Sequence, residues 1–459
     1  MLLDQSDRVE KNLIVNAPGV SKSTTITKLV CPKSGQDRKE TIIFEDPDDI
    51  VKGSESLSVS VIGDILGPSV KHTSRMLETP SGNGDVSSMT LWSNLLIFDY
   101  TQRFGNSLGD DVHRRLLGNI KSAYKVHIDT YLNPYDGSFN EFYQEPYCCQ
   151  KTIYKHQTLG REVGPDVCLM NEMSSSWITA ATVRSLHRIE QMGIMSLDKQ
   201  LWFALGWLAQ PNKLLEDGCM KTSCYNCEAG LKHGKSRRSL SAYILATVIE
   251  LTNCGENKRQ IFYKDPLPQD CGDHECADSM CNPRQFAITD KEIAAFIRKA
   301  FDCFTPAKLA KDSYATIQVF RLISVYFANC RMPKHDNKVL RLLEHTMPMV
   351  FANTVQPYWS QKHVDDGSRI EMTGYVLLAL NNFARAMKAE TLRFTNDDLQ
   401  TLIRRRAQLS KWLIEQRNSL GGWIGTADTM AALEAITDFA ALEAVGQREE
   451  CCNLKLNTK

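Results

Sequence analysis

The chain contains no apolar run near the roughly 20 residues that a membrane-spanning helix needs. Its first residues, MLLDQSDRVEKN, lack the apolar core of a secretory signal. It also has no Asn-x-Ser/Thr acceptor for N-glycosylation, which counts mildly against secretion. The sequence therefore argues against a membrane-spanning helix within this chain. Whether the protein is secreted must be inferred from other features.

The chain also lacks an excess of charge of either sign. Lys and Arg together number 54, and Asp and Glu together number 54. No overall field therefore attracts nucleic acid or an acidic surface. Two local basic clusters, Lys232–Arg238 and Arg404–Arg406, are interpreted as a solvated loop and an exposed helix face. We expect no nucleic-acid partner.

Cysteine, in contrast, is abundant. The count of 15 in 459 residues is high for a cytosolic chain. Such crowding indicates disulfide bonds in an oxidising compartment, or metal ligation. The spacing does not define the pairing. The disulfide candidates are Cys148, Cys149, Cys168, Cys219, Cys224, Cys227, Cys254, Cys271, Cys276 and Cys281.

Residues 1–62 predict β-structure. The runs TTITKLV, ETIIF and LSVSVIG are rich in β-branched residues and are separated by Pro, Gly and Asp. This stretch is too short to close a sheet, so we expect part of a β-domain rather than a whole one.

From about Leu91 onward the hydrophobic period changes from that of a strand to that of a helix. One helix type recurs, with a small polar entry followed by Ala, Val and Leu. It begins near Thr179, Ala242, Ala315, Thr373 and Thr429. The predicted helices cover 91–104, 111–132, 174–192, 196–210, 238–252, 289–304, 313–329, 336–347, 369–387, 399–417 and 426–444.

A recurring helix pair is typical of a stacked or closed helical array. We expect a mainly α chain that forms an α/α toroid of about six helix pairs over residues 63–445, with a tail at 446–459. The small-residue helices should form the inner ring and the amphipathic helices the outer ring. Asn253–Phe286, rich in Cys, Asp and Pro, is expected as an insertion held by disulfides.

A glycine-rich turn, Gly82-Asn83-Gly84-Asp85, precedes the first predicted helix. Glycine and asparagine tolerate positive φ, and Asp85 or Ser87 can cap a helix. A phosphate-binding loop would also need a Gly-Lys-Ser/Thr ending, which is absent. The local sequence therefore predicts a tight turn into a helix.

A zinc-dependent intracellular enzyme on the same scaffold is a distant alternative. Its ligands would come from Cys224, Cys227, Cys271, His274, Cys276 and Cys281. These residues do not form two matched Cys-x-x-Cys pairs, so disulfides are preferred and we expect no metal and no cofactor. The acidic run Asp46–Asp49 falls in the predicted β region, and no Gly-x-Ser-x-Gly elbow marks a hydrolase nucleophile.

Several motifs follow one another in an order that resembles a known family. They are VSVIGDILGPS (Val59–Ser69), the turn Pro80–Gly84, DGSFNEF, SSSWITAATV, DKQLWFALGWLAQ, IEMTGYVLLAL and GGWIGTADTMAALEAITDFA. This series resembles the thioester-domain region of the α2-macroglobulin/complement (thioester-containing protein) family, over about residues 15–445. The resemblance implies that segment 1–62 begins a CUB-like domain into which the toroid is inserted. It also implies that the remaining domains of a longer chain are partners.

In active members of that family the turn reads Pro-x-Gly-Cys-Gly-Glu-Gln, and the Cys and Gln side chains form an internal thioester. Here Asn83 stands for Cys and has no sulfur, and Val86 stands for Gln and has no side-chain carbonyl. Glu228 stands where acyl-transferring members have a His. The resemblance therefore implies a degenerate thioester turn, made of Gly82, Asn83, Gly84, Asp85 and Val86.

A thioester-less chain of this kind most resembles the macroglobulin complement-related proteins of arthropods. That resemblance implies a secreted protein that is not an enzyme and binds protein, cell-surface or microbial-surface ligands without a covalent bond. Its expected roles are innate immune recognition for phagocytosis, or organisation of epithelial septate junctions at cell–cell contacts. Protease inhibition of the α2-macroglobulin type, in the full-length protein, is the alternative.

Overall fold

The structure is a computed structural model of the 459-residue chain. Short N-terminal stretches and almost all of the helical region are described. The described residues are 10–11, 20, 22–30, 41–43, 50–51, 53–61, 65–66, 83–104, 110–133, 136–142, 174–221, 237–255, 261–265, 284–330, 337–354, 356–359, 365–389, 397–418 and 421–443.

Helices dominate the described residues. The α-helices are α3 (Gly84–Phe104), α4 (Asp110–Tyr131), α5 (Ser176–Gln191), α6 (Asp198–Leu208), α7 (Arg237–Thr252), α9 (Asp290–Ala300), α10 (Pro306–Leu309), α11 (Ser313–Asn329), α12 (Asn337–Asn353), α13 (Asp366–Lys388), α14 (Asp397–Arg404), α15 (Arg406–Glu415) and α16 (Thr426–Glu443). Short 3-10 helices are η2 (Pro211–Lys213), η3 (Asn253–Gly255) and η4 (Phe301–Cys303). The two strands are β1 (Ile261–Asp265) and β2 (Arg284–Ile288).

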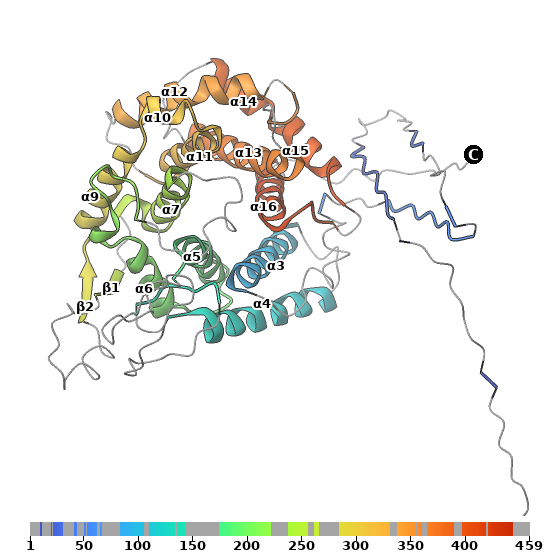
Figure 1. The fold of residues 1–459 in the computed structure, drawn as a ribbon, viewed down its shortest axis with the longest axis horizontal. Coiled ribbons are helices and arrows are strands. Elements are labelled where there is room, and N and C mark those ends of the chain that lie inside the picture. The colour runs from blue at the N-terminus through green and yellow to red at the C-terminus, as the bar shows by residue number, and fades with distance from the viewer. Residues whose placement is uncertain are drawn as a thin grey trace, which may run out of the picture.

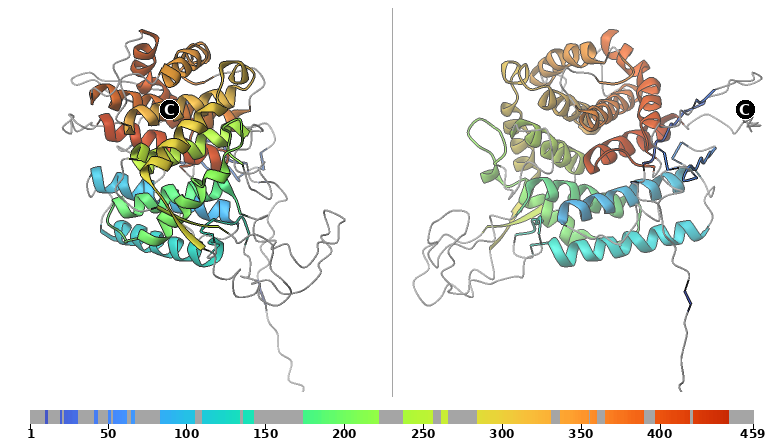
Figure 2. Two further views of the ribbon diagram at one scale, coloured as in Figure 1. Left: turned by 90° about the vertical axis from the view of Figure 1, so that its left-hand side faces the viewer. Right: turned by 45° about the vertical axis from the view of Figure 1, so that its right-hand side comes forward.

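The helices lie in two concentric layers around an axis (Figure 1). In the inner layer α3 packs against α5, α5 against α7, α7 against α11, α11 against α13, α13 against α16, and α16 returns to α3. The outer layer packs outside it, with α4 on α3, α6 on α5, α9 on α7, α12 on α11, and α15 on both α13 and α16. Figure 2 shows the same layering from two other sides, with α3 and α4 side by side. This arrangement agrees with the predicted α/α toroid.

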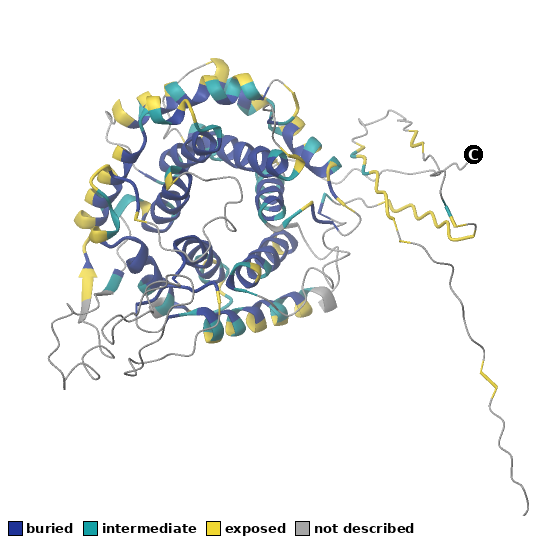
Figure 3. Ribbon diagram, in the orientation of Figure 1, coloured by how far each residue is buried: buried dark blue, intermediate teal, exposed yellow. Residues whose placement is uncertain are grey.

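The inner helices are buried on nearly every side (Figure 3). In α11 the run from Tyr314 to Phe327 is buried throughout, and α7 is buried from Ser239 to Ile249. A helix without a polar face needs protein around it on all sides, which only an inner layer provides. The recurring small-residue helices predicted from Thr179, Ala242, Ala315, Thr373 and Thr429 are these inner helices.

The outer helices α4, α9 and α12 are amphipathic. Local caps define where some elements begin. In α9 the side chain of Thr289 accepts a hydrogen bond from Glu292 N, and the Glu292 carboxylate accepts one from Thr289 N at 2.7 Å. This reciprocal pair is a capping box. The side chains of Ser175 and Asp312 cap the inner helices α5 and α11 in a simpler way.

Three boundaries differ from the predicted ones. Helix α3 begins at Gly84 instead of residue 91, so Gly84 and Asp85 of the glycine-rich turn already belong to its first helical turn. Helix α12 continues through Pro348 to Asn353, although a proline removes one backbone donor. The predicted helix 399–417 is divided into α14 and α15 at Arg405.

A two-stranded hairpin is the one sheet among the described residues, and it was not predicted. Strands β1 and β2 pair antiparallel, with Ile261 opposite Ile288. They lie within or beside the predicted insertion Asn253–Phe286. Gly206 of α6 packs directly on β1, because a Cβ there would lie 1.6 Å from the carbonyl oxygen of Phe262.

The predicted β segment at residues 1–62 contains no strand among its described residues, which are extended and mostly exposed. Leu57, Val59 and Val61 are exposed at alternating positions. The CUB-like assignment and the domain limits at 62 and 445 stay predictions. No helix in the described part of the chain is long and apolar enough to cross a membrane.

Three turns between helices each contain a glycine with a similar positive φ. Gly137, Gly218 and Gly421 have φ of 82°, 81° and 79°, values that favour glycine. In the first two turns the preceding aspartate accepts a hydrogen bond from the backbone two residues later, Asp136 from Ser138 N and Asp217 from Cys219 N. The internal repeat is therefore visible in the turns as well as in the helices.

Candidate functional site

Asn83 caps the first inner helix. Its side-chain oxygen accepts a hydrogen bond from Val86 N at 3.0 Å, and its carbonyl oxygen accepts one from Ser87 N at 3.0 Å. The first turn of a helix leaves its N–H groups without intrahelical acceptors, so a cap of this kind stabilises α3. The residue at the predicted cysteine position therefore has a structural role.

Gly84 docks this turn against residues 136–142. Its backbone nitrogen donates to the carbonyl oxygen of Glu141 at 2.7 Å. A Cβ on Gly84 would lie 2.3 Å from the carbonyl oxygen of Asn140, so no other residue fits without a shift of the backbone. The same segment is held to α5, because Phe139 N donates to Thr179 Oγ1 at 2.9 Å.

His127 of α4 holds the turn in place through a hydrogen bond to Ser87 of α3. Its Nδ1 lies 2.9 Å from Ser87 Oγ, and its Nε2 lies 2.8 Å from Thr182 Oγ1, so one imidazole joins α3, α4 and α5. The ring is fully buried, and burial lowers the pKa of His127 to about 3. A neutral imidazole between two buried hydroxyls, with no carboxylate bonded to it among the described residues, is a support rather than a hydrolytic triad.

The turn at Asp136 ties this region to α6 and η2. Asp136 accepts hydrogen bonds from Ser138 N at 2.9 Å and from Trp207 Nε1 at 3.0 Å. The ammonium of Lys213 lies 3.6 Å from the centre of the Trp207 ring. Burial raises the pKa of Asp136 and lowers that of Lys213 to about 8. These groups are used in holding the loop of residues 136–142 in place.

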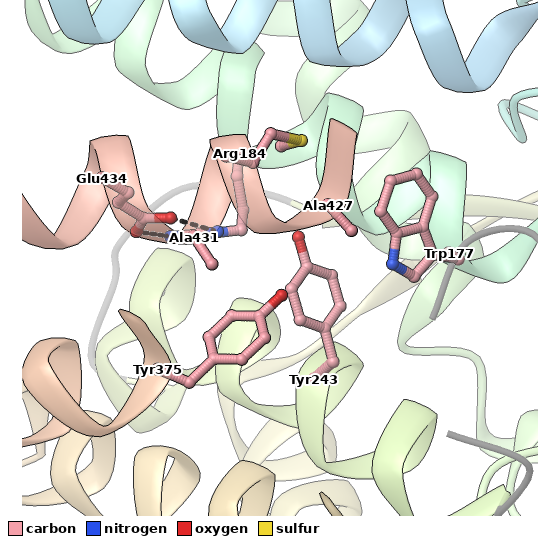
Figure 4. Close-up of a pocket in the computed structure, with 8 residues that line it drawn as sticks. Trp177, Arg184, Tyr243, Tyr375, Ala427, Ala431 and Glu434 are labelled. Atoms are coloured by element: carbon pink, nitrogen blue, oxygen red, sulfur yellow. Dashed lines mark hydrogen bonds and ion pairs between the residues drawn. The ribbon is translucent and has the colours of Figure 1, made fainter. Parts of the chain in front are cut away.

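A second polar cluster lies inside the ring, around Arg184 of α5 (Figure 4). Its guanidinium forms a bidentate ion pair with Glu434 of α16 and contacts Glu250 of α7 at 3.3 Å. It also lies 4.8 Å from the ring centre of Trp92 on α3. Burial opposes each charge, but Glu434 and Glu250 hold the pKa of Arg184 well above its usual value, and Arg184 holds that of Glu250 below. One side chain thus joins four inner helices.

A small pocket opens beside this ion pair and is lined mainly by aromatic side chains and the face of α16. Trp177, Tyr243 and Tyr375 face Ala427, Met430 and Ala431 across it (Figure 4). Arg321 of α11 lies 5.4 Å and 5.6 Å from the ring centres of Tyr243 and Tyr375, so a cation already occupies those aromatic faces. We interpret this cluster as ring-stabilising rather than as a ligand site.

The structure brings four of the five residues of the degenerate turn together at the start of α3. Asn83, Gly84, Asp85 and Val86 are described, and the apolar side chain of Val86 is 37% exposed. Gly82 and Glu228 lie outside the described residues, so the lost histidine position stays a prediction. Within the described turn, position 83 carries no thiol and position 86 carries no side-chain amide.

Two disulfide bonds involve predicted cysteines. Cys219 pairs with Cys303, and Cys254 pairs with Cys330. The sequence did not single out Cys303 and Cys330, because both end predicted helices where they read as apolar packing residues. The other candidates, Cys148, Cys149, Cys168, Cys224, Cys227, Cys271, Cys276 and Cys281, lie outside the described residues.

The zinc alternative gains no support. All of its proposed ligands, including His274, lie outside the described residues, and the described part holds no group of three His, Cys, Asp or Glu arranged for a metal ion. Two arginines of the basic run Arg404–Arg406 bind other parts of the chain. Arg405 donates to Thr354 O at 2.7 Å, and Arg406 pairs with Glu443 at 3.0 Å.

Sequence reasoning missed the contacts of His127, Arg184 and Glu434. A signal existed for the latter two, since each charged residue directly follows a stretch of mainly small and apolar residues in its helix, Ala180–Val183 before Arg184 and Met430–Leu433 before Glu434. A charge at such a position requires a partner on another inner helix. The sequence alone does not say which helix supplies it.

Comparison with known proteins places these features in a family context. The family model described as "A-macroglobulin TED domain" matches residues 59–264 and 279–439. Ovostatin of Gallus gallus is 24% identical over 451 residues, which is 96% of this chain and 25% of ovostatin. Alpha-2-macroglobulin-like protein 1 of Mus musculus is 22% identical over 441 residues, which is 95% of this chain and 25% of the relative. The chain thus spans about a quarter of the length of these curated relatives.

Proposed function

This chain belongs to the A-macroglobulin family through its TED domain, and from that membership we propose that it is a non-covalent binding module whose thioester chemistry has been lost. The family consists of protease inhibitors and binding proteins rather than enzymes, so we assign no catalytic reaction. The ligands proposed are proteins or the surfaces of cells and microbes. The resemblance to macroglobulin complement-related proteins favours these ligands over a trapped protease.

The observation that carries the proposal is the chemistry of the turn. Asn83 uses its side-chain oxygen to cap α3, and Val86 carries only an isopropyl group at the position that corresponds to the glutamine. An internal thioester needs a thiol at position 83 and a side-chain carbonyl at position 86, and the turn provides neither. The turn is nevertheless firmly placed, because Gly84 docks on Glu141 and His127 bonds to Ser87.

The disulfide bonds support an extracellular location. Cys219–Cys303 and Cys254–Cys330 each close a long stretch of chain. Bonds of this kind persist in oxidising compartments and are rare in the cytosol. We therefore propose that the protein is secreted, with the other domains of a longer chain as its permanent partners and with cell–cell junctions as one site of action.

The test compares the natural chain with a variant that restores both reacting groups. The chain is incubated with killed bacteria or yeast, with and without methylamine, and the cells are then washed in hot SDS. The natural chain should bind, elute completely and carry no methylamine on the peptide that contains Asn83 and Val86. The variant Asn83→Cys with Val86→Gln serves as the control that can regain methylamine uptake, and its folding is checked by circular dichroism.

Two outcomes would contradict the proposal. One is natural chain that stays on the cells after hot SDS, which would show a covalent bond. The other is natural chain that binds neither cell type in physiological buffer, which would remove the surface-recognition role.

A further inference from the structure

Asn83–Gly84 is the only Asn-Gly pair in the sequence. In such a pair the backbone nitrogen of the glycine can attack the side-chain amide carbon of the asparagine, because glycine has no Cβ to obstruct the approach. We propose that Asn83 is a latent deamidation site, and that the docking of Gly84 on Glu141 controls when it reacts. Neither the family match nor the proposed binding function assigns this chemistry.

The reaction is an internal acyl transfer. A bond forms between Gly84 N and Asn83 Cγ, the bond from Cγ to Nδ2 breaks, and the side-chain nitrogen leaves as ammonia after taking up the proton from Gly84 N. The product is a five-membered cyclic imide. Water then opens the imide at either carbonyl and leaves aspartate or isoaspartate at position 83, so no oxidant or cofactor is needed.

One half of the site is already activated. Val86 N donates to Asn83 Oδ1 at 3.0 Å, at the N-terminus of the 21-residue helix α3. The attack places negative charge on this oxygen. A backbone N–H aimed at it and the positive end of the helix dipole both stabilise that charge. Asn83 is only half-buried, so water and small nucleophiles reach it.

The other half is blocked. The N–H of Gly84, which must lose its proton and turn toward Asn83 Cγ, donates to the carbonyl oxygen of Glu141 at 2.7 Å. The neighbouring carbonyl oxygen of Asn140 also packs closely on Gly84, because a Cβ there would lie only 2.3 Å from it. The cyclisation therefore requires residues 139–142 to leave the turn.

That docked segment is in turn held by α5. Phe139 N donates to Thr179 Oγ1 at 2.9 Å, and both groups are fully buried. Loss of the Thr179 hydroxyl leaves a buried donor without an acceptor and favours undocking. The rate of deamidation at Asn83 should therefore increase with the fraction of time that the segment 136–142 is undocked from α3.

The experiment uses hydroxylamine, which opens the cyclic imide and releases a new N-terminus at Gly84. A single Asn-Gly pair means one cut and two fragments on a gel, and peptide mass spectrometry reports ammonia loss at Asn83 in parallel. The folded chain, the chain in urea and the variant Thr179→Val are compared. Thr247→Val is the matched control, because Thr247 is equally buried on α7 and its hydroxyl bonds only to Tyr243 O in its own helix.

We expect the chain in urea to be cut at Gly84 and to lose ammonia first at Asn83, while the folded chain stays intact. Thr179→Val should react about tenfold faster in native buffer than Thr247→Val. Equal rates for folded and urea-treated chain would overturn the control by docking, as would equal rates for the two variants. Earlier ammonia loss at another residue, such as Asn418 before Ser419, would overturn the site itself.

Discussion

The two sides of the ring are held together by different forces. The side from α6 to α12 carries both described disulfides, Cys219–Cys303 and Cys254–Cys330. The opposite side, where α3 and α5 meet α16, has no cysteine in any of these three helices. There Arg184 links α5 to α16 and α7 through its carboxylate partners, and His127 links α3, α4 and α5 through two hydroxyls.

This difference follows from the order of the chain. Helix α3 is the first inner helix and α16 is the last, so the contact between them joins the two ends of the ring (Figure 1). A covalent bond stabilises mainly by limiting the unfolded chain, and it is indifferent to pH and salt over the physiological range. The strength of links made by buried charges and a buried imidazole depends on their ionisation. The stability of the side with α3, α5 and α16 should therefore be the one that changes with pH and salt.

Removal of a covalent bond should have the largest effect. The double variant Cys219→Ala with Cys303→Ala releases a crosslink between residues 84 apart in sequence. The loop-closure entropy of that length corresponds to about 4 kcal/mol in the free energy of unfolding. Urea unfolding followed by circular dichroism measures it. A loss below about 1 kcal/mol would mean that the disulfide side is held by packing and that the comparison between the two sides fails.

Loss of the closing charge should come next. Arg184→Met leaves Glu434 and Glu250 without their partner inside the ring, at a cost of about 3 kcal/mol in the free energy of unfolding. The matched control is Arg103→Met, since Arg103 pairs with Asp99 but is 48% exposed. The control should lose less than about 1 kcal/mol. Similar losses in both variants would show that Arg184 does not close the ring.

Acid should weaken the closing side through His127. Burial lowers the pKa of this imidazole to about 3 in the folded chain, from an ordinary 6.5. The unfolded chain therefore binds a proton below pH 6.5 that the folded chain does not, and the stability present above pH 6.5 is lost as the pH falls toward 3. Between pH 7 and pH 5 the free energy of unfolding should fall by about 2 kcal/mol from this group.

The variant His127→Gln isolates that contribution, because glutamine does not titrate. Its unfolding free energy should change less between pH 7 and pH 5 than that of the natural chain, whatever its absolute stability. A natural pH dependence in His127→Gln would refute the assignment.

The sequence predicted which helices form the inner layer, but it did not predict where α3 begins or that β1 and β2 pair. The inner helices were predicted because a run of small and apolar residues, such as that of α11, has one stable place in a ring. The start of α3 was placed too late, since Gly84, Asp85 and Ser87 carry no hydrophobic period. The hairpin of β1 and β2 was missed because its partners are separated by a long Cys-rich segment.

The sequence predicted which reacting groups the turn lacks, and the structure showed which contacts hold the turn in place. The identities of Asn83 and Val86 are sufficient to show that two reacting groups are missing. The cap at Val86 N and the docking on Glu141 depend on distances that a sequence does not contain. The pairings of Cys219 and Cys254 were undetermined for the same reason, because many pairings fit one set of spacings.

The position of the closing contact also has a mechanical consequence. A pulling force applied to the chain before α3 and after α16 acts directly on the contact between these two helices. Tension would therefore first peel these two helices apart, since no covalent bond spans them. The two crosslinked stretches between residues 219 and 330 would not extend under the same pull, because each disulfide carries the force past the chain it encloses. The ring would yield in two stages, with the arc that contains the disulfides as the part that resists.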